Sequence, residues 1–388
     1  MQVADEYIRL AFRLNKHVVG LVDSYFGPDH LKREVEAEGI LPLAKLKEQC
    51  VALKRAVGDE GGSEDYQIYM LKQLEALQAQ IDGRLGLVPS FQTYVRRLFD
   101  VDAGPADETE LGRCRQDVAL LLSQLGYAGN LRDDVRRWEE DQVIGGQAMF
   151  DLIHVFLRDA RSRTRRMIGL AEGEDVSVEA VHEKPWSGYN WYQGKYRSLI
   201  QINLDLPRTR LEIEDLVTHE AYPGHHTDHS TKEKHLYVDR GILEASILLI
   251  NTPSSVIGEG LASYGNTLIY RSRSDPAHRL ARLLRKLRRA CDVNACLMLH
   301  AQGLDRRSVQ RYLESSALLT PQRAEKRLEF LTDPLWRAYT YTYWKGERLI
   351  EQAWSQAERA GATDRVLDVL YKELLCPTTL VKRVNEIC

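Results

Sequence analysis

Apolar residues recur at helical spacing through most of the 388-residue sequence, and this periodicity constrains the fold more than any other feature. In the first half of the chain, helical runs alternate with breaks such as Gly104-Pro105. After that break, Leu111, Val118 and Leu121 share one face of an expected helix. We therefore predict a mainly α-helical protein with a large helical body.

The periodicity changes in the middle of the chain. Residues 176–181 and 196–205 alternate or carry β-branched side chains, which is typical of strands. The Trp-, Gly- and Tyr-rich segment 186–195 is expected to separate them. We therefore predict a small β-sheet or ribbon and two regions, a helical region 1–171 and a region 172–388. No low-complexity linker marks the boundary, so one continuous body is the alternative.

Charge and hydropathy exclude two classes of partner. A formal net charge of −3 gives no bulk attraction to nucleic acid or to an anionic membrane. The basic helix face at 279–289 is interpreted as solvated or salt-bridged rather than as a nucleic-acid stripe. The N-terminus lacks a signal-peptide pattern, no apolar run is long enough for a bilayer, and the six cysteines form no CxxC motif. We expect a cytoplasmic protein without nucleic-acid or membrane partners, of undetermined oligomeric state.

The segment THEAYPGHHTDH, residues 218–229, concentrates four histidines around a Pro-Gly pair. In the zinc-hydrolase motif H-E-x-x-H, two histidines one helical turn apart bind one ion, and the glutamate between them acts as general base. His219 and Glu220 begin such a motif, but Pro223 stands where the second histidine should be. A second ligand must therefore come from further along the chain.

The next candidates are His225 and His226. In a straight helix, His225 would point about 120° away from His219, and His226 would lie about 10 Å up the axis. Pro223 and Gly224 break the helix here, because proline removes a hydrogen bond and glycine tolerates unusual dihedral angles. The break would return one of the two histidines to His219. We favour His225, because related H-E-x-G-H motifs place their second ligand directly after a glycine.

Two other interpretations of this segment stay open. His225 and His229 lie four residues apart and would form a two-histidine site without His219, although such a site leaves Glu220 without a role. Alternatively, the segment is a polar helix end that binds no metal.

A third ligand is expected from a following helix. Glu259 lies between the apolar residues Ile257 and Leu261, after Pro253 and an expected helix N-cap at Ser254 or Ser255. A carboxylate in apolar surroundings needs a partner, and Zn²⁺ would provide one. The alternative is an ordinary exposed glutamate. The predicted zinc ligands are thus His219, Glu259 and one of the two adjacent histidines.

The motifs HEAYPGHH, 219–226, and EGLASY, 259–264, resemble those of the bacterial family called domain of unknown function eight-eight-five. Members carry H-E-A-x-P-G-H-H, E-G-W-A-x-Y and a late Y-K-x-G element, which is found here as YWKG, 343–346. Leu261 replaces the common Trp, and Thr227-Asp228 replaces the usual Leu-Gln. The resemblance covers residues 196–350 and implies a zinc metallopeptidase whose third ligand is a glutamate, with undefined substrates.

Together, these residues predict a zinc-dependent hydrolase of peptide bonds. Glu220 would accept the proton of the attacking water and deliver it to the leaving amine. Tyr343, which matches the late family element, would donate a hydrogen bond to the oxyanion, and Gly346 would leave room for substrate. The strand at 196–205 would either border the cleft and align an extended substrate or form plain sheet core.

Tyr339 and Tyr341 precede Tyr343 at intervals of two residues, so we expect the three rings to spread over different helix faces. Two alternative functions remain. The first is a metal-dependent amidohydrolase acting on a small non-peptide amide. The second is a helical binding protein with a structural metal site, against which the presence of Glu220 argues, since a structural site needs no general base.

Overall fold

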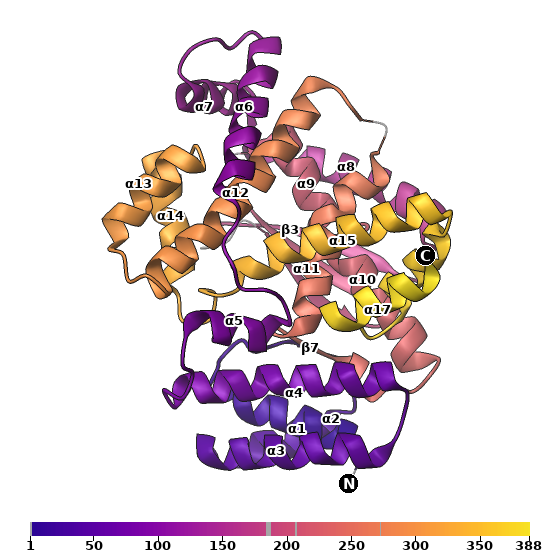
Figure 1. Ribbon diagram of the computed structural model, residues 1–388. Helices are drawn as coiled ribbons and strands as arrows, with labels where there is room; N and C mark the ends of the chain where they lie inside the picture. Colours follow the sequence, from indigo (N-terminus) through magenta and orange to yellow (C-terminus); the bar gives the residue numbers. More distant parts are fainter. Residues whose placement is uncertain (1, 184–187, 206–207, 272) are drawn as a thin grey trace.

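The computed structural model describes residues 2–183, 188–205, 208–271 and 273–388. The protein is mainly helical, as the periodicity predicts. Figure 1 shows helices α1 to α4 at one end of the molecule, α11 and α15 in its middle, and α6 and α7 at the other end. Within the described ranges, no helix combines the length and the apolar character needed to cross a membrane.

Four N-terminal helices pack into a layer of their own: α1 (Val3–Asn15), α2 (Asp29–Ala37), α3 (Leu43–Glu60) and α4 (Glu64–Arg84). Helix α5 (Phe91–Phe99) contacts α4, but its buried residues belong to the core of the rest of the molecule. The core of this layer includes Ile247 and Leu249 from much later in the chain. Both lie on β7 (Ile247–Leu249), which pairs antiparallel with β1 (Val22–Tyr25). The strand pair therefore ties the N-terminal layer to the centre of the molecule.

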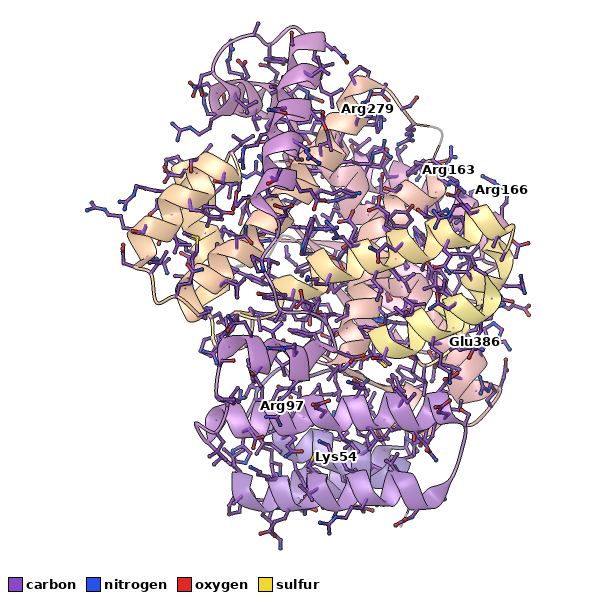
Figure 2. All side chains as sticks on the ribbon, in the orientation of Figure 1. Lys54, Arg97, Arg163, Arg166, Arg279 and Glu386 are labelled. Atoms are coloured by element: carbon purple, nitrogen blue, oxygen red, sulfur yellow. The ribbon has the colours of Figure 1, made fainter. Side chains whose placement is uncertain are left out.

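A second group of helices includes the long helix α12 (Pro276–His300). The other members are α6 (Glu108–Gln124), α7 (Leu131–Glu140), α13 (Arg306–Ser316) and α14 (Pro321–Thr332). Arg279, near the start of α12, lies exposed at the periphery (Figure 2). Further along the helix, Lys286 lies 2.8 Å from Glu351 and Arg289 lies 2.7 Å from Glu347. These pairs confirm the interpretation of the basic face as salt-bridged.

The centre of the molecule is built from α9 (Arg210–Glu220), α10 (His225–Lys232), α11 (Pro253–Ile269) and α15 (Thr340–Ala360), with α16 (Thr363–Lys372) and α17 (Pro377–Ile387) beside them. Helices α11 and α15 cross at Gly260 and Gly346. A Cβ atom on Gly346 would lie 2.3 Å from the carbonyl oxygen of Val256, so only glycine permits this crossing. The expectation that Gly346 leaves room for substrate is therefore wrong, because this glycine is buried between two helices.

The largest sheet has three strands in the order β3-β5-β4: β3 (Asp175–Val181), β4 (Gly188–Gly194) and β5 (Arg197–Asn203). The parallel pair β3 and β5 confirms the two predicted strands. The segment between them is not the predicted separator, because β4 pairs antiparallel with β5. Buried and exposed side chains alternate along β4, because Asn190 and Tyr192 are buried and Trp191 between them is exposed. Trp186 and Ser187, also in the predicted separator, lie outside the described residues.

The remaining elements connect these parts: β2 (Val143–Ile144), α8 (Gly146–Met167), β6 (Arg208–Thr209), a π-helical turn (Glu233–Val238) and a 3₁₀ turn (Leu243–Ser246). Strand β2 pairs with β6 and β1 pairs with β7, so both pairs join segments from the two sides of residue 172. Helix α9 begins directly after β6 with a reciprocal cap between Thr209 and Glu212. This cap fixes the start of the helix that carries His219.

Candidate metal centre

The histidine segment lies in a cavity of about 200 Å³ at the meeting point of α9, α10, α11, α15 and strands β1 and β4. Tyr189 and Asn190 of β4 line this cavity. The predicted strand 196–205 does not border it, because β5 is the central strand and both of its edges are hydrogen-bonded to neighbours. The expectation that this strand aligns substrate is thus wrong, and the edge strand β4 takes the position beside the cavity.

Helix α9 ends at Glu220, and α10 begins at His225 after a tight turn. The backbone N–H of Gly224 donates to the carbonyl oxygen of Thr218 at 3.0 Å. A Cβ atom on Gly224 would lie 1.9 Å from the carbonyl oxygen of His219. Glycine therefore allows the start of α10 to fold back against the last turn of α9. As a result, the His219 and His225 rings lie 4.8 Å apart.

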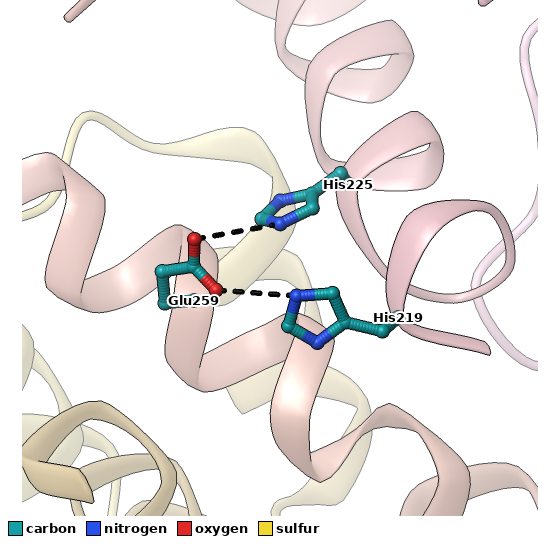
Figure 3. A group of neighbouring side chains, drawn as sticks. All are labelled: His219, His225 and Glu259. Carbon is teal, nitrogen blue, oxygen red and sulfur yellow. Dashed lines mark ion pairs between the residues drawn. The ribbon is translucent and has the colours of Figure 1, made fainter. Parts of the chain in front are cut away.

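Glu259 of α11 faces both rings (Figure 3). Its Oε2 lies 3.2 Å from His219 Nε2, and its Oε1 lies 3.7 Å from His225 Nε2. One potential ligand atom from each of the three residues lies within 4.8 Å of the other two. The structure thus brings together His219, Glu259 and the favoured second histidine, His225.

His226 faces the opposite way. Its Nδ1 lies 2.9 Å from Ser198 Oγ of β5, and its Nε2 lies 3.2 Å from Glu174 Oε2. The alternative in which His226 is the second ligand is wrong, because neighbouring residues on a helix point about 100° apart and the turn directs His225 to the cavity. Since a carboxylate can only accept, Nε2 carries the proton when His226 is neutral.

The His226 contact belongs to a buried network around Glu174. Tyr222 also donates to the Glu174 carboxylate, and Arg161 lies 2.7 Å from it. Burial raises the pKa of Glu174, but hydrogen bonds from His226 and its other partners outweigh burial and lower the pKa to about 2. The network holds the first turn of α10 on the sheet, so His226 positions its neighbour His225.

Glu259 has a further partner that sequence reasoning missed. The Tyr339 hydroxyl donates to Glu259 Oε1 at 2.8 Å. Burial raises the pKa of the Glu259 carboxyl, but the two histidines and Tyr339 outweigh burial and lower the pKa to about 2. Its buried Oε2 accepts no hydrogen bond of ordinary geometry from the described residues. The sequence contains one signal for this contact: Tyr339 precedes Tyr343 by about one helical turn, so the two side chains share a helix face.

Glu220 and Tyr343 line the same cavity. The carbonyl oxygen of Glu220 accepts a hydrogen bond of 2.6 Å from Asn190 Nδ2, which ties the end of α9 to β4. The Tyr343 ring lies 6.2 Å from the His219 ring, and its hydroxyl has no hydrogen bond to any described residue. Burial raises the pKa of Tyr343 well above its usual value, so the phenol is a neutral donor.

The other tyrosine of this segment, Tyr341, leaves the cavity and donates to the carbonyl oxygen of Ala103 at 3.2 Å in the core. The prediction that the three tyrosines do not all enter one cleft is therefore confirmed. His229 lines the cavity one turn beyond His225, and their rings stack 5.7 Å apart. His229 lies outside the three-residue group.

Asp23 reaches the cavity from the N-terminal layer and was also missed. It lies on β1 and accepts a hydrogen bond from Tyr189 of β4. Burial raises the pKa of the Asp23 carboxyl. No local motif marks this residue, because the pairing of β1 with β7 brings it to the site.

Comparison with known proteins places the chain in a family. Residues 106–366 match the family described as "Bacterial protein of unknown function (DUF885)". The chain belongs to this family. The match covers α9, α10, α11 and α15, which carry the candidate metal centre. Among curated proteins, no match is found for this DUF885 chain.

Two solved structures share the fold of this DUF885 protein. One is described as a "putative lipoprotein" from Colwellia psychrerythraea, with a TM-score of 0.59 and 18% identity over 92% of this chain and 62% of that chain. The other is described as a "putative lipoprotein of unknown function" from Shewanella oneidensis, with a TM-score of 0.60 and 13% identity over 89% of this chain and 72% of that chain. The DUF885 chain thus spans less than two thirds of the length of the Colwellia protein.

Proposed function

We propose that this protein is a zinc-dependent hydrolase of peptide bonds. The observation that carries the proposal is the convergence of His219 Nε2, His225 Nε2 and the Glu259 carboxylate within 4.8 Å. Two imidazoles and one carboxylate form a donor set typical of catalytic zinc sites, in which a fourth position stays open. The hydrolase assignment adds Glu220 and Tyr343, which line the same cavity.

The chemistry of these residues fits a divalent cation. Glu259 is buried, and its Oε2 accepts no hydrogen bond of ordinary geometry from the described residues, although His219 Nε2 lies 3.2 Å away. A cation between these atoms would stabilise the buried carboxylate. Tyr339 donates to the other oxygen and would orient the carboxylate. A zinc ion held by these three residues would supply Lewis acidity to the scissile carbonyl and to the attacking water.

The remaining steps belong to side chains of the chain itself. Glu220 follows His219 directly and would accept the proton of the attacking water, then return it to the leaving amine. Tyr343 carries a neutral hydroxyl without a partner among the described residues, and it would donate to the developing oxyanion. Asn190 would keep Glu220 in place through its carbonyl oxygen.

The size of the cavity favours a small substrate. Its volume of about 200 Å³ lies below the range of ~300–1,000 Å³ that is common for ligand pockets. We therefore propose a short peptide as substrate, and a small non-peptide amide is the second candidate, because the same residues would hydrolyse either.

The test uses protein purified without a His-tag. Elemental analysis should find about one zinc per chain in the wild type, and the metal should be lost in His219→Ala and Glu259→Ala. The zinc-loaded wild type should cleave members of a peptide library, chelation should abolish cleavage, and added zinc should restore it. Metal retained in both variants would overturn the ligand assignment. A stoichiometric, tightly held metal without cleavage of any peptide or small amide would instead indicate a structural site.

A further inference from the structure

A second cavity, of about 340 Å³, lies beside the metal centre between α9 and α12. Among the described residues, eight arginines but only four carboxylates line it. Six of these arginines are paired with carboxylates, for example Arg273 with Glu214 and Arg288 with Glu139. The cavity wall therefore carries more positive than negative charge.

Arg208 and Arg282 are the exceptions. Neither forms an ion pair with any carboxylate in the described parts of the chain. The Nε of Arg208 is buried and has no acceptor among the described residues, and the same holds for Nε of Arg285 in the same wall. Burial and the nearby Arg323 disfavour the charged form of Arg208 and lower its pKa, with partial compensation from Glu212. One nitrogen of Arg282 donates to the carbonyl oxygen of Arg273 at 3.3 Å. Among the described residues, the fold thus keeps two guanidinium groups in a partly buried cavity without a carboxylate partner.

The cavity has a local excess of positive charge, although the whole chain has a net charge of −3. A concave wall of one sign focuses the electric field and raises the local concentration of ions of the opposite sign. Guanidinium groups bind carboxylates and phosphates through paired, charge-assisted hydrogen bonds. The volume also falls in the range of cavities that bind small molecules.

We infer that this arginine cavity binds a small anionic ligand with at least two carboxylate or phosphate groups, and that Arg208 and Arg282 supply the guanidinium groups that no described carboxylate pairs. This inference goes beyond the proposed hydrolysis and requires no metal.

The arginine cavity lies next to the cavity of the candidate metal centre. Asp215 on α9 lines the arginine cavity, whereas His219, one turn later, lines the metal cavity. Arg289 lines the arginine cavity and holds its guanidinium 5.5 Å above the ring of Tyr343, which lines the metal cavity. Arg289 and Tyr343 are therefore in contact where the two cavities adjoin. A free polyanion and the acidic end of a peptide would both supply the anionic groups that this cavity binds.

The experiment is isothermal titration calorimetry of the full-length protein with three probes at fixed ionic strength. The probes are pyrophosphate, triglutamate and the neutral triglutamine. The variants are Arg208→Gln, Arg282→Gln and their combination, and Arg279→Gln is the matched control because Arg279 is an exposed arginine on the same helix. Neither tested arginine forms an ion pair with a described residue, so Arg208→Gln should unfold at the same denaturant concentration as the wild type. Arg282→Gln should unfold at a slightly lower denaturant concentration, because it loses the hydrogen bond from Arg282 to the carbonyl oxygen of Arg273.

We expect wild type and Arg279→Gln to bind pyrophosphate or triglutamate but not triglutamine. Each single variant should bind about tenfold more weakly and the double variant about a hundredfold more weakly, because each loses a charge-assisted hydrogen-bonding group. Binding of pyrophosphate alone would identify a free polyanion, and binding of triglutamate would identify an acidic peptide. If pyrophosphate binds to a metal instead of the arginines, the double variant should bind it as tightly as the wild type. Equal affinities in wild type and double variant, or no binding of either anion, would overturn the inference.

Discussion

Replacing Gly224 with alanine should separate the two histidines of the candidate metal centre. The added Cβ would lie 1.9 Å from the carbonyl oxygen of His219 and 2.5 Å from that of Thr218. Ordinary contacts between carbon and oxygen begin at about 3.3 Å, so the turn would have to move by ~1.4 Å. Both contacted atoms belong to the backbone and cannot rotate away. His225 follows Gly224 directly and would move with it.

Two consequences can be estimated. Overpacking costs about 1–3 kcal/mol, and loss of the hydrogen bond from Gly224 to Thr218 costs about 1 kcal/mol more. The free energy of unfolding should therefore fall by about 2–4 kcal/mol. Ligand distances tolerate deviations of only about 0.2 Å, so a shift of His225 by ~1 Å should weaken zinc binding at least about tenfold.

Zinc affinity is measured by competition with a chromophoric chelator, and stability by denaturant unfolding followed by circular dichroism. Gly58→Ala is the matched control, because Gly58 lies in α3 and an added Cβ there meets nothing within 4 Å. This control should gain about 0.5–1 kcal/mol of stability and keep its zinc affinity. If Gly224→Ala binds zinc as tightly as the wild type, the close approach at Gly224 does not set the position of His225.

The adjacent histidines should respond in opposite ways. His225→Ala should lose zinc and keep the stability of the metal-free fold. His226→Ala should still bind about one zinc per chain at saturating zinc, but about tenfold more weakly because His226 positions His225, and it should lose about 2–4 kcal/mol of stability. Elemental analysis, chelator competition and denaturant unfolding measure these effects, and the reverse pattern would exchange the roles of the two histidines. Tyr343→Phe should lower the hydrolysis rate about 10²- to 10³-fold with zinc affinity unchanged, because only the oxyanion donor is removed. Tyr341→Phe is the control for this variant, because the Tyr341 hydroxyl donates to the carbonyl oxygen of Ala103 in the core. The control should lose about 1 kcal/mol of stability and keep the hydrolysis rate of the wild type. Equal hydrolysis rates in the two phenylalanine variants would show that Tyr343 has only a structural role.

Local patterns were enough to predict much of the fold and the members of the candidate centre. The helices follow from apolar periodicity, and Glu259 was recognised as a carboxylate in an apolar helical segment. The choice between His225 and His226 depends on the path of a single turn. The Gly-His order favours His225, and contacts of Gly224 with α9 in the structure give the physical reason for that choice.

Features that depend on distant segments could not be predicted. The sequence predicts a separator at β4, because the alternating part of this strand is short and glycines lie at both of its ends. Asp23 reaches the cavity only through the pairing of β1 with β7. Gly346 was assigned to substrate because it follows Tyr343 on the same helix, whereas the crossing of α11 and α15 buries it. In each case a long-range contact decides what the residue does.

The proposed hydrolysis is tested most directly by the rate of zinc-loaded Glu220→Gln on the best substrate of the wild type. Glutamine has nearly the shape of glutamate but cannot accept the proton, and Glu220 is not among the three grouped ligands. We predict a full complement of zinc, an unchanged unfolding midpoint and a rate about 10²- to 10⁴-fold below that of the wild type. Turnover at the wild-type rate by this variant would contradict the assignment of Glu220 as general base and with it the proposed mechanism.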